Sequence, residues 1–199
     1  MLSTKDVVIK RVFDITLGLV GISLSWWIML LAWLIASIET KSNGLFMQKR
    51  IGYKGEEFLV FKIKTMYPNT TNNSTVTTAN DSRITKSGKF FRRYKIDELP
   101  QLFNVVFGSM SFVGPRPDVK GFADKLQGED RVILSIKPGI TSPASIKYKN
   151  EEEILANVKN PIEYNKNVIW KDKVAINKEY IKNWSLKNDI LYIIKTITG

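Results

Sequence analysis

The sequence RRYKIDELPQLFNVVFGSMSFVGPRP, residues 92–117, contains the clearest structural signals of the chain. Apolar side chains recur in it at steps of three and four residues, a spacing that places them on one face of a helix. These are Ile96, Leu99, Phe103 and Val106. Asp97 is a favourable N-cap residue, Pro100 falls in the first turn, where its missing N–H costs least, and Gly108 can end the helix. We therefore predict a helix that begins at two adjacent carboxylates, Asp97 and Glu98.

The same stretch ends in Gly114-Pro115-Arg116-Pro117, which predicts a stiff support for Arg116. Pro115 fixes the backbone before the arginine, and Pro117 biases the arginine itself toward extended dihedral angles. A planar guanidinium held in this way suits a phosphate group. However, two acidic residues at the start of a helix commonly form only a cap that interacts with the helix dipole. A catalytic and a capping interpretation of the two carboxylates therefore both remain open.

The composition limits the chemistry that the chain can perform. Its 199 residues are enough for one domain with a real core. The chain has no cysteine and no histidine, which excludes disulfides, thiolate catalysis, imidazole bases and metal sites built from these residues. A metal would be an oxygen-bound ion such as Mg²⁺. A net charge of +11 and a pI near 9.7 predict attraction to nucleic acid, an anionic membrane leaflet or phosphorylated substrates.

Residues 15–38 contain no charged side chain and predict a membrane segment. A straight helix of these 24 residues reaches roughly 36 Å, against about 30 Å for a hydrocarbon core. Both flanks are basic and favour the cytoplasmic face; they carry Lys5, Lys10 and Arg11 before the segment and Lys41, Lys49, Arg50 and Lys54 after it. A re-entrant hairpin would satisfy both flanks, because small residues near the middle weaken the helix; these are Gly18, Gly21, Ser23 and Ser25. A plain spanning helix is the alternative, and the residues alone leave both open.

A β-hairpin is predicted after the membrane segment. Residues 45–51 and 57–65 are β-compatible runs separated by Gly52-Tyr53-Lys54-Gly55. Lys62 and Lys64 would share one face of the second strand. They would either address phosphate or guard a solvated edge strand.

The remaining segments predict a loop and several helices. Residues 68–82 are rich in Thr and Asn and predict a mobile surface loop. Residues 83–95 and 118–134 predict helices, and residues 140–143 predict a small polar loop that offers backbone N–H groups. Residues 185–197 predict a helix whose apolar face suits either packing on the core or an interfacial position on a membrane.

Together these elements predict an α+β fold that is mainly helical. Residues 1–40 would form an N-terminal membrane-associated helix. Residues 41–199 would form a cytoplasmic catalytic domain with a β-hairpin and interfacial amphipathic helices. Two rival interpretations are a membrane-tethered nucleic-acid-binding protein, suggested by the charge, and an adaptor in which the carboxylates only cap. The sequence contains no zinc-finger, RNA-recognition or other nucleic-acid motif, so we expect no nucleic-acid partner.

The motifs along the chain resemble a known family, the bacterial sugar transferases. These monotopic phosphoglycosyl transferases move a phosphosugar from a nucleotide diphosphate sugar to polyprenyl phosphate and so begin glycan assembly. Each motif is weak alone, but their order and spacing together are specific. They are KR-x-x-D at 10–14, QKRIG at 48–52, KIKTM at 62–66, RIT at 83–85, DELPQL at 97–102, NV at 104–105, MS at 110–111, VGPRP at 113–117 and PGIT at 138–141.

The resemblance implies roles for individual residues. Asp97 would be the nucleophile that forms a covalent phosphosugar intermediate, and Glu98 its catalytic partner. Mg²⁺ would bind at Asp97 and the diphosphate, and Arg116 would hold phosphate. The other substrate-binding residues would be Pro115, Pro117, Lys62 and Arg83. Nearby cations and the helix amino end are expected to keep the carboxylate of Asp97 ionised.

The resemblance also implies where the protein acts. It implies a re-entrant helix that enters and leaves the bacterial inner membrane on the cytoplasmic side, in contact with lipids. The chain departs from many small relatives at this point, because Ser23 is followed by Leu24 instead of proline. The donor would be a nucleotide diphosphate sugar, with UMP as the leaving group if it is a UDP-sugar. No particular oligomeric state is predicted.

Overall fold

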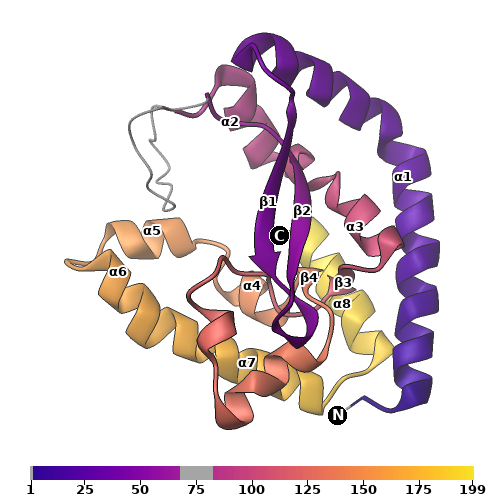
Figure 1. The fold of residues 1–199 in the computed structure, drawn as a ribbon, viewed down its shortest axis with the longest axis vertical. Coiled ribbons are helices and arrows are strands. Elements are labelled where there is room, and N and C mark those ends of the chain that lie inside the picture. The colour runs from indigo at the N-terminus through magenta and orange to yellow at the C-terminus, as the bar shows by residue number, and fades with distance from the viewer. Residues whose placement is uncertain (1, 68–82) are drawn as a thin grey trace.

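A computed structural model describes residues 2–67 and 83–199, and its first element is one long helix, α1 (Thr4–Thr40). Ser3 begins this helix with a capping box, in which its hydroxyl accepts from Asp6 N and the Asp6 carboxylate accepts from Ser3 N. Figure 1 shows α1 running along one side of the molecule and then bending over one end of it. By length and composition, α1 is the one helix among the described residues that could cross a membrane.

The buried residues of α1 form two groups, one toward each end of the helix. The first group is Lys10, Asp14 and Gly18, and the second is Met29, Ala32, Ala36 and Thr40. No residue is buried over 19–28. In the first group, Gly18 faces α3 (Gln101–Phe107), whereas Lys10 and Asp14 contact other segments. In the second group, Ala32 and Ala36 pack with Ile63 and Phe91. Both halves of the helix therefore contain residues buried against the rest of the chain, while residues 19–28 contain none.

The small residues that were expected to weaken α1 leave it continuous. Ser23 Oγ donates at 2.8 Å to the carbonyl three residues earlier, and Ser25 Oγ donates at 2.6 Å to the carbonyl four residues earlier. Such bonds bend a helix without ending it. Gly18 instead permits close packing, because a Cβ atom there would lie 2.9 Å from Val106 Cγ2. The re-entrant topology stays a prediction.

The predicted hairpin is confirmed as β1 (Leu45–Ile51) and β2 (Glu57–Ile63). The strands are antiparallel, with Leu45 opposite Ile63 and Ile51 opposite Glu57. β2 ends two residues before the predicted limit, and the turn contains a short 3-10 segment, η1 (Tyr53–Gly55). The hairpin lies in the middle of the molecule, between α1 and the helices of residues 151–164 (Figure 1).

The helix predicted in residues 83–95 is confirmed as α2 (Lys86–Arg93). It is followed by a 3-10 turn, η2 (Ile96–Glu98), and then by α3, which ends at Gly108 as predicted. The predicted N-cap was wrong, since Asp97 lies inside η2 and α3 begins only after Pro100. Lys95 adopts a left-handed conformation with φ of 56° and so turns the chain from α2 into η2.

The predicted apolar face of this helix was also wrong. The buried residues of α3 are Gln101, Leu102, Asn104 and Val105, whereas Phe103 is exposed. Asn104 is buried because its side chain completes the edge of β2. Its Oδ1 accepts from Phe61 N at 3.0 Å, and its Nδ2 donates to Leu59 O at 2.6 Å.

A second, two-stranded parallel sheet supports the end of the quoted motif. It consists of β3 (Ser111–Val113) and β4 (Gly139–Thr141). Gly114 donates to Thr141 O, and Gly139 donates to Pro115 O, both at 3.0 Å. The backbones approach so closely that a Cβ atom at Gly114 would lie 2.3 Å from Lys137 O. The predicted polar loop over 140–143 was therefore wrong, because strand β4 and a helix cap occupy this segment.

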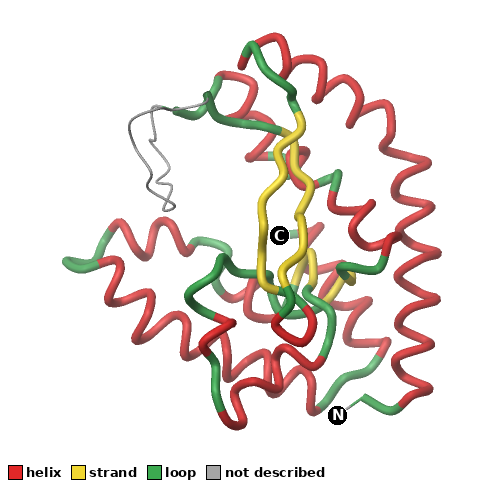
Figure 2. The backbone as a smooth tube through the Cα atoms, viewed as in Figure 1, coloured by secondary structure: helices red, strands yellow, loops and turns green. Residues whose placement is uncertain are grey.

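The C-terminal part of the chain is a set of short and medium helices (Figure 2). The helix predicted over 118–134 is instead two 3-10 segments, η3 (Ala123–Lys125) and η4 (Gly128–Ser135). The helix predicted after Ser185 is confirmed as α8, capped by the Ser185 hydroxyl. The others are α4 (Pro143–Lys147), α5 (Glu151–Ala156), α6 (Pro161–Tyr164), a π-helical turn η5 (Asn165–Ile169), α7 (Trp170–Lys182) and α8 (Leu186–Thr198).

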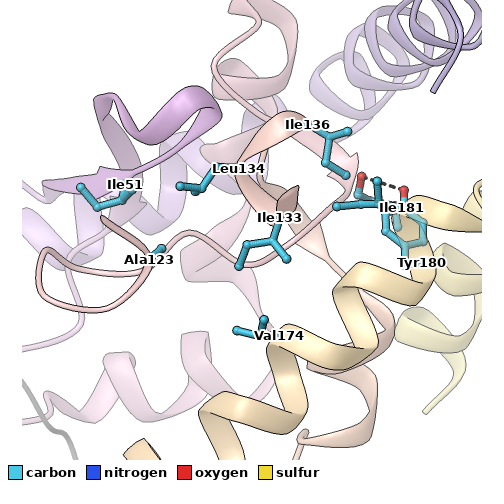
Figure 3. Packing of buried hydrophobic residues seen from close by; sticks show 9 residues of the cluster. Ile51, Ala123, Ile133, Leu134, Ile136, Val174, Tyr180 and Ile181 are labelled. Atoms are coloured by element: carbon cyan, nitrogen blue, oxygen red, sulfur yellow. Dashed lines mark hydrogen bonds between the residues drawn. The ribbon is translucent and has the colours of Figure 1, made fainter. Parts of the chain in front are cut away.

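The core of this part joins the hairpin end, β3, the 3-10 segments and α7 (Figure 3). Its buried members are Ile51, Val113, Ala123, Ile133, Leu134, Ile136, Val174, Tyr180 and Ile181. The predicted fold class is confirmed as mainly helical with small sheets. The loop predicted at 68–82 lies outside the described residues. The division at residue 40 and an interfacial position of any helix stay predictions.

Candidate active site

The candidate site centres on Glu98, which binds two cations from different parts of the chain. Its Oε1 atom accepts from Lys62 Nζ at 3.0 Å and from Arg116 Nη2 at 2.9 Å. Lys62 comes from β2, Glu98 from η2, and Arg116 from the segment after β3. Burial alone would raise the pKa of Glu98, but Arg116 and Lys62 outweigh it and hold the pKa far below its usual range. Glu98 is therefore a firmly ionised acceptor.

Arg116 owes its position to the backbone on either side of it. The buried Pro115 accepts from Gly139 N at 3.0 Å, and the buried Pro117 accepts from Arg50 Nη1 at 3.3 Å. The two predicted prolines thus hold the backbone, while the arginine side chain remains 48% exposed. The guanidinium can therefore reach a ligand while its backbone stays fixed.

Asp97 lies beside this cluster in a different environment. It is 8% exposed, and its Oδ1 atom has no hydrogen-bond partner among the described residues. Burial raises the pKa of Asp97, and the neighbouring Glu98 raises it further. Lys62, Lys95 and Arg92 oppose the shift without cancelling it. Desolvation therefore outweighs the nearby cations in shifting the pKa of Asp97, and its ionised state in the site stays a prediction.

The donor atoms present fit a divalent ion only together with a substrate. Within residues 2–67 and 83–199 there is no group of three or more acidic side chains that could hold a metal. Mg²⁺ is usually bound by one or two carboxylates plus substrate phosphates. Asp97 offers a buried carboxylate oxygen that no described residue bonds, while Glu98 is already paired with two cations. Asp97 is thus the residue that suits such an ion.

Comparison with known proteins identifies the family of the chain. The family model described as "Bacterial sugar transferase" matches residues 5–199. The chain belongs to the bacterial sugar transferase family. It is 35% identical over 96% of its length to a UDP-glucose:undecaprenyl-phosphate glucose-1-phosphate transferase of Xanthomonas campestris, of which it covers 38%. It is 31% identical over 95% of its length to a UDP-N-acetylgalactosamine-undecaprenyl-phosphate N-acetylgalactosaminephosphotransferase of Aeromonas hydrophila, of which it covers 43%.

A third bacterial sugar transferase is shorter. The chain is 38% identical over 61% of its length to a putative undecaprenyl-phosphate N-acetylgalactosaminyl 1-phosphate transferase of Bacillus subtilis, and covers 68% of that protein. The chain therefore spans about two fifths of the length of the first two relatives and about two thirds of the third.

Two charged residues that sequence reasoning missed adjoin Arg116. Arg50 supports Pro117, and its other guanidinium nitrogens donate to Gln48. Burial raises the pKa of Asp118 to about 6, against the opposing effects of Lys173, Arg50 and Arg116. Arg50 belongs to the quoted QKRIG motif, and Asp118 directly follows VGPRP. Their places in these motifs were the available signal.

Two other predicted basic residues make contacts with segments outside the Glu98 ion pairs. Lys64 follows the end of β2, and its Nζ donates to Ser42 Oγ at 2.9 Å. Arg83 is half-buried next to Ile84, and its carbonyl accepts from Tyr67 N at 2.9 Å. The structure therefore brings Lys62 to the site and separates it from Lys64. The substrate-binding role of Arg83 stays a prediction.

Proposed function

We propose that the chain is a phosphoglycosyl transferase that moves a sugar 1-phosphate from a UDP-sugar to polyprenyl phosphate and so begins glycan synthesis. The observation that carries the proposal is the pair of adjacent carboxylates with different surroundings. Glu98 is bound to Lys62 and Arg116, while Asp97 has a buried oxygen without a partner in the described part of the chain. The names of the relatives, which pair UDP-sugars with undecaprenyl phosphate, support the same class of substrates.

Donor binding would use the two cations that now hold Glu98. Arg116 is the more exposed, with 48% of its side chain accessible, against 22% for Lys62. A diphosphate would share these donors with the Glu98 carboxylate, and a guanidinium can bind phosphate oxygens in pairs. Mg²⁺ held at Asp97 would supply charge neutralisation for the diphosphate when bound. Glu98 would hold the two cations next to each other and orient them before the donor arrives.

The transfer would take two displacements at one phosphorus atom. In the first, an Asp97 carboxylate oxygen forms a bond to the sugar-bearing phosphorus, and the bond to the UMP oxygen breaks. UMP leaves with the electron pair. In the second, a phosphate oxygen of polyprenyl phosphate attacks the same phosphorus, and the bond to Asp97 breaks. The carboxylate is regenerated, and the lipid carries the phosphosugar away.

The packing of α1 supports a re-entrant membrane segment. Residues 10–18 and 29–40 of this helix both contain residues buried against one folded body, and residues 19–28 do not. A helix that crossed the whole bilayer would separate its two ends by about 30 Å of hydrocarbon. One water-facing domain could not then pack on both ends. We therefore infer that only the middle of α1 enters one leaflet, from the cytoplasmic face of the inner membrane.

The nucleophile assignment is tested with undecaprenyl phosphate, Mg²⁺ and a panel of UDP-sugars. The wild-type chain should release UMP, and Asp97→Asn, which keeps the side-chain shape, should release none. Asp130→Asn, at a carboxylate exposed on η4, serves as the matched control and should retain turnover. Without the lipid acceptor, the intact mass of the wild-type protein should increase by one phosphosugar. Turnover by Asp97→Asn at the wild-type rate would exclude the covalent role.

The topology is tested with single cysteines, since the chain has none of its own. Cysteines placed at Lys5 and Ser42, near the two ends of α1, should react with an impermeant maleimide from the same side of sealed vesicles. A cysteine at Leu24 in the exposed middle should be protected by the lipid. Labelling of the two ends from opposite sides would establish a spanning helix.

A further inference from the structure

A buried network of polar side chains connects the start of α1 with the C-terminal helix α8. Asp189 of α8 is fully buried, and its Oδ2 accepts from Lys10 Nζ at 2.6 Å and from Trp184 Nε1 at 3.0 Å. Its Oδ1 accepts from the Tyr180 hydroxyl at 2.7 Å. Lys10 Nζ also lies 3.4 Å from the Tyr180 hydroxyl oxygen. Residues 179 positions apart thus share one enclosed ion pair.

The network also holds the backbone of β3. The Tyr180 hydroxyl lies 3.2 Å from the Val113 carbonyl oxygen, the bond drawn as a dashed line in Figure 3. One helical turn after Lys10, Asp14 Oδ1 accepts from Phe112 N at 3.0 Å and from Ser111 Oγ at 3.1 Å. Ser111 and Phe112 are therefore bonded to a side chain of α1, and the Val113 carbonyl shares the one proton of the Tyr180 hydroxyl with Asp189 Oδ1.

Only two residues separate β3 from Arg116. The segment between them is held by Gly114, which donates to Thr141 O, and by Pro115, which accepts from Gly139 N. With β3 and this crossing both fixed, the Arg116 backbone has little freedom. A change in the network would therefore shift the constrained backbone of residues 113–116 and with it the Arg116 guanidinium.

We propose that four residues fix the position of Arg116 by holding β3. These positioning residues are Lys10, Asp14, Tyr180 and Asp189. This inference rests on the proposed function, because Arg116 acts on the phosphates of the donor there. Its consequence is that the docking of α1 on α7 and α8 prepares the donor site. A chain in which α1 is displaced would bind the donor weakly even with every active-site side chain intact.

The chemistry of the network supports positioning beyond bulk stability. A buried ion pair stabilises a fold less than apolar side chains of similar size would, so its presence is weak evidence of a purely stabilising role. Burial and the Asp189 carboxylate raise the pKa of Tyr180, which keeps its hydroxyl protonated and able to donate. Directional bonds of this kind fix a backbone carbonyl at one place, which apolar contacts do not.

The first experiment needs no activity and compares two tyrosines. Tyr180→Phe removes the hydroxyl that faces Asp189 and Val113. The control, Tyr148→Phe, removes a hydroxyl bonded to Asp172 between α4 and α7. In the full chain in detergent, amide hydrogen exchange over residues 111–117 should become about tenfold faster in Tyr180→Phe, the effect of losing one such bond, and stay unchanged in the control. Equal exchange in the two variants would overturn the proposal.

The second experiment links the network to Arg116. Tyr180→Phe should raise the KM for the UDP-sugar about tenfold, with kcat at saturating donor changed by less than about twofold. In an Arg116→Ala background the same substitution should have no further effect on KM, because the residue through which it acts is gone. If the KM of the double variant rises by the product of the factors measured for the two single variants, the coupling between Tyr180 and Arg116 is refuted. If the wild-type chain releases no UMP, the proposed function fails, and the exchange comparison still decides whether the network positions residues 111–117.

Discussion

Replacing Gly114 with alanine tests how far the site depends on the close crossing of β3 and β4. A Cβ atom at this position would lie 2.3 Å from Lys137 O and 3.0 Å from Gly139 N. Both neighbours are backbone atoms, so no side-chain rotation can relieve the overlap. Restoring an ordinary contact of 3.4 Å requires a movement of about 1.1 Å, the difference between 3.4 and 2.3 Å. The two strands must therefore separate.

The size of the effect follows from the bonds that this movement breaks. Gly114 N–Thr141 O and Gly139 N–Pro115 O, both 3.0 Å long, span the crossing. A buried group left without its hydrogen bond costs about 1–3 kcal/mol, so the expected loss in the free energy of unfolding for two such bonds is about 2–6 kcal/mol. At about 2–4 °C per kcal/mol for a chain of this size, the melting temperature should fall by roughly 4–24 °C.

The measurement is thermal unfolding of the detergent-solubilised full chain, followed by circular dichroism. Gly21→Ala in α1 is the matched control, because its Cβ would meet only carbons of the Leu102 side chain, at 3.1 Å and beyond. These flexible atoms can move, and alanine favours a helix over glycine by about 1 kcal/mol. If Gly114→Ala melts at the wild-type temperature, the crossing is not rigid and the account of Arg116 is wrong.

Two further predictions concern pH and have opposite signs. The lowered pKa of Glu98 stabilises the fold above its unfolded value of about 4.5, so the free energy lost in Glu98→Gln should be largest at neutral pH and shrink as the pH falls below that value. If the difference in the free energy of unfolding between wild type and Glu98→Gln does not change with pH, this prediction is contradicted. The raised pKa of Asp118, about 6 against 3.8, costs stability as the pH rises through this interval. Asp118→Asn should therefore gain stability relative to wild type between pH 4 and 6, measured by denaturant titration, and a loss there would refute the assignment.

Sequence patterns predicted the elements that are determined by neighbouring residues. The hairpin, α2, the end of α3 at Gly108 and the cap of α8 at Ser185 all follow from neighbouring residues. The face of α3 could not be predicted in this way. Asn104 is polar but buried, since it bonds two backbone groups of a strand more than 40 residues away. A periodicity of apolar residues has no means of marking such a position.

The sequence predicted four residues of the candidate site, but it missed Arg50 and Asp118 and did not indicate the electrostatics. The motifs identified Asp97, Glu98, Lys62 and Arg116, and the structure brings Glu98, Lys62 and Arg116 into contact. Sequence adjacency could not tell which carboxylate pairs with the cations. Nor could it reveal the pairing of Lys10 with Asp189, because both ends lie in segments that suggested only membrane topology and packing.

The difference between the two carboxylates is itself an argument for their proposed roles. A carboxylate that already accepts from two cations has its charge neutralised and is a poor nucleophile, which describes Glu98. Burial raises the pKa of Asp97 and so makes its carboxylate more basic. A more basic carboxylate is the better nucleophile once it is ionised. The buried oxygen of Asp97, which has no partner within residues 2–67 and 83–199, costs stability, and an unsatisfied buried group of this kind is typical of a functional site. If Glu98 were the nucleophile instead, it would have to separate from both cations before it could react. The buried oxygen of Asp97 would then have no function.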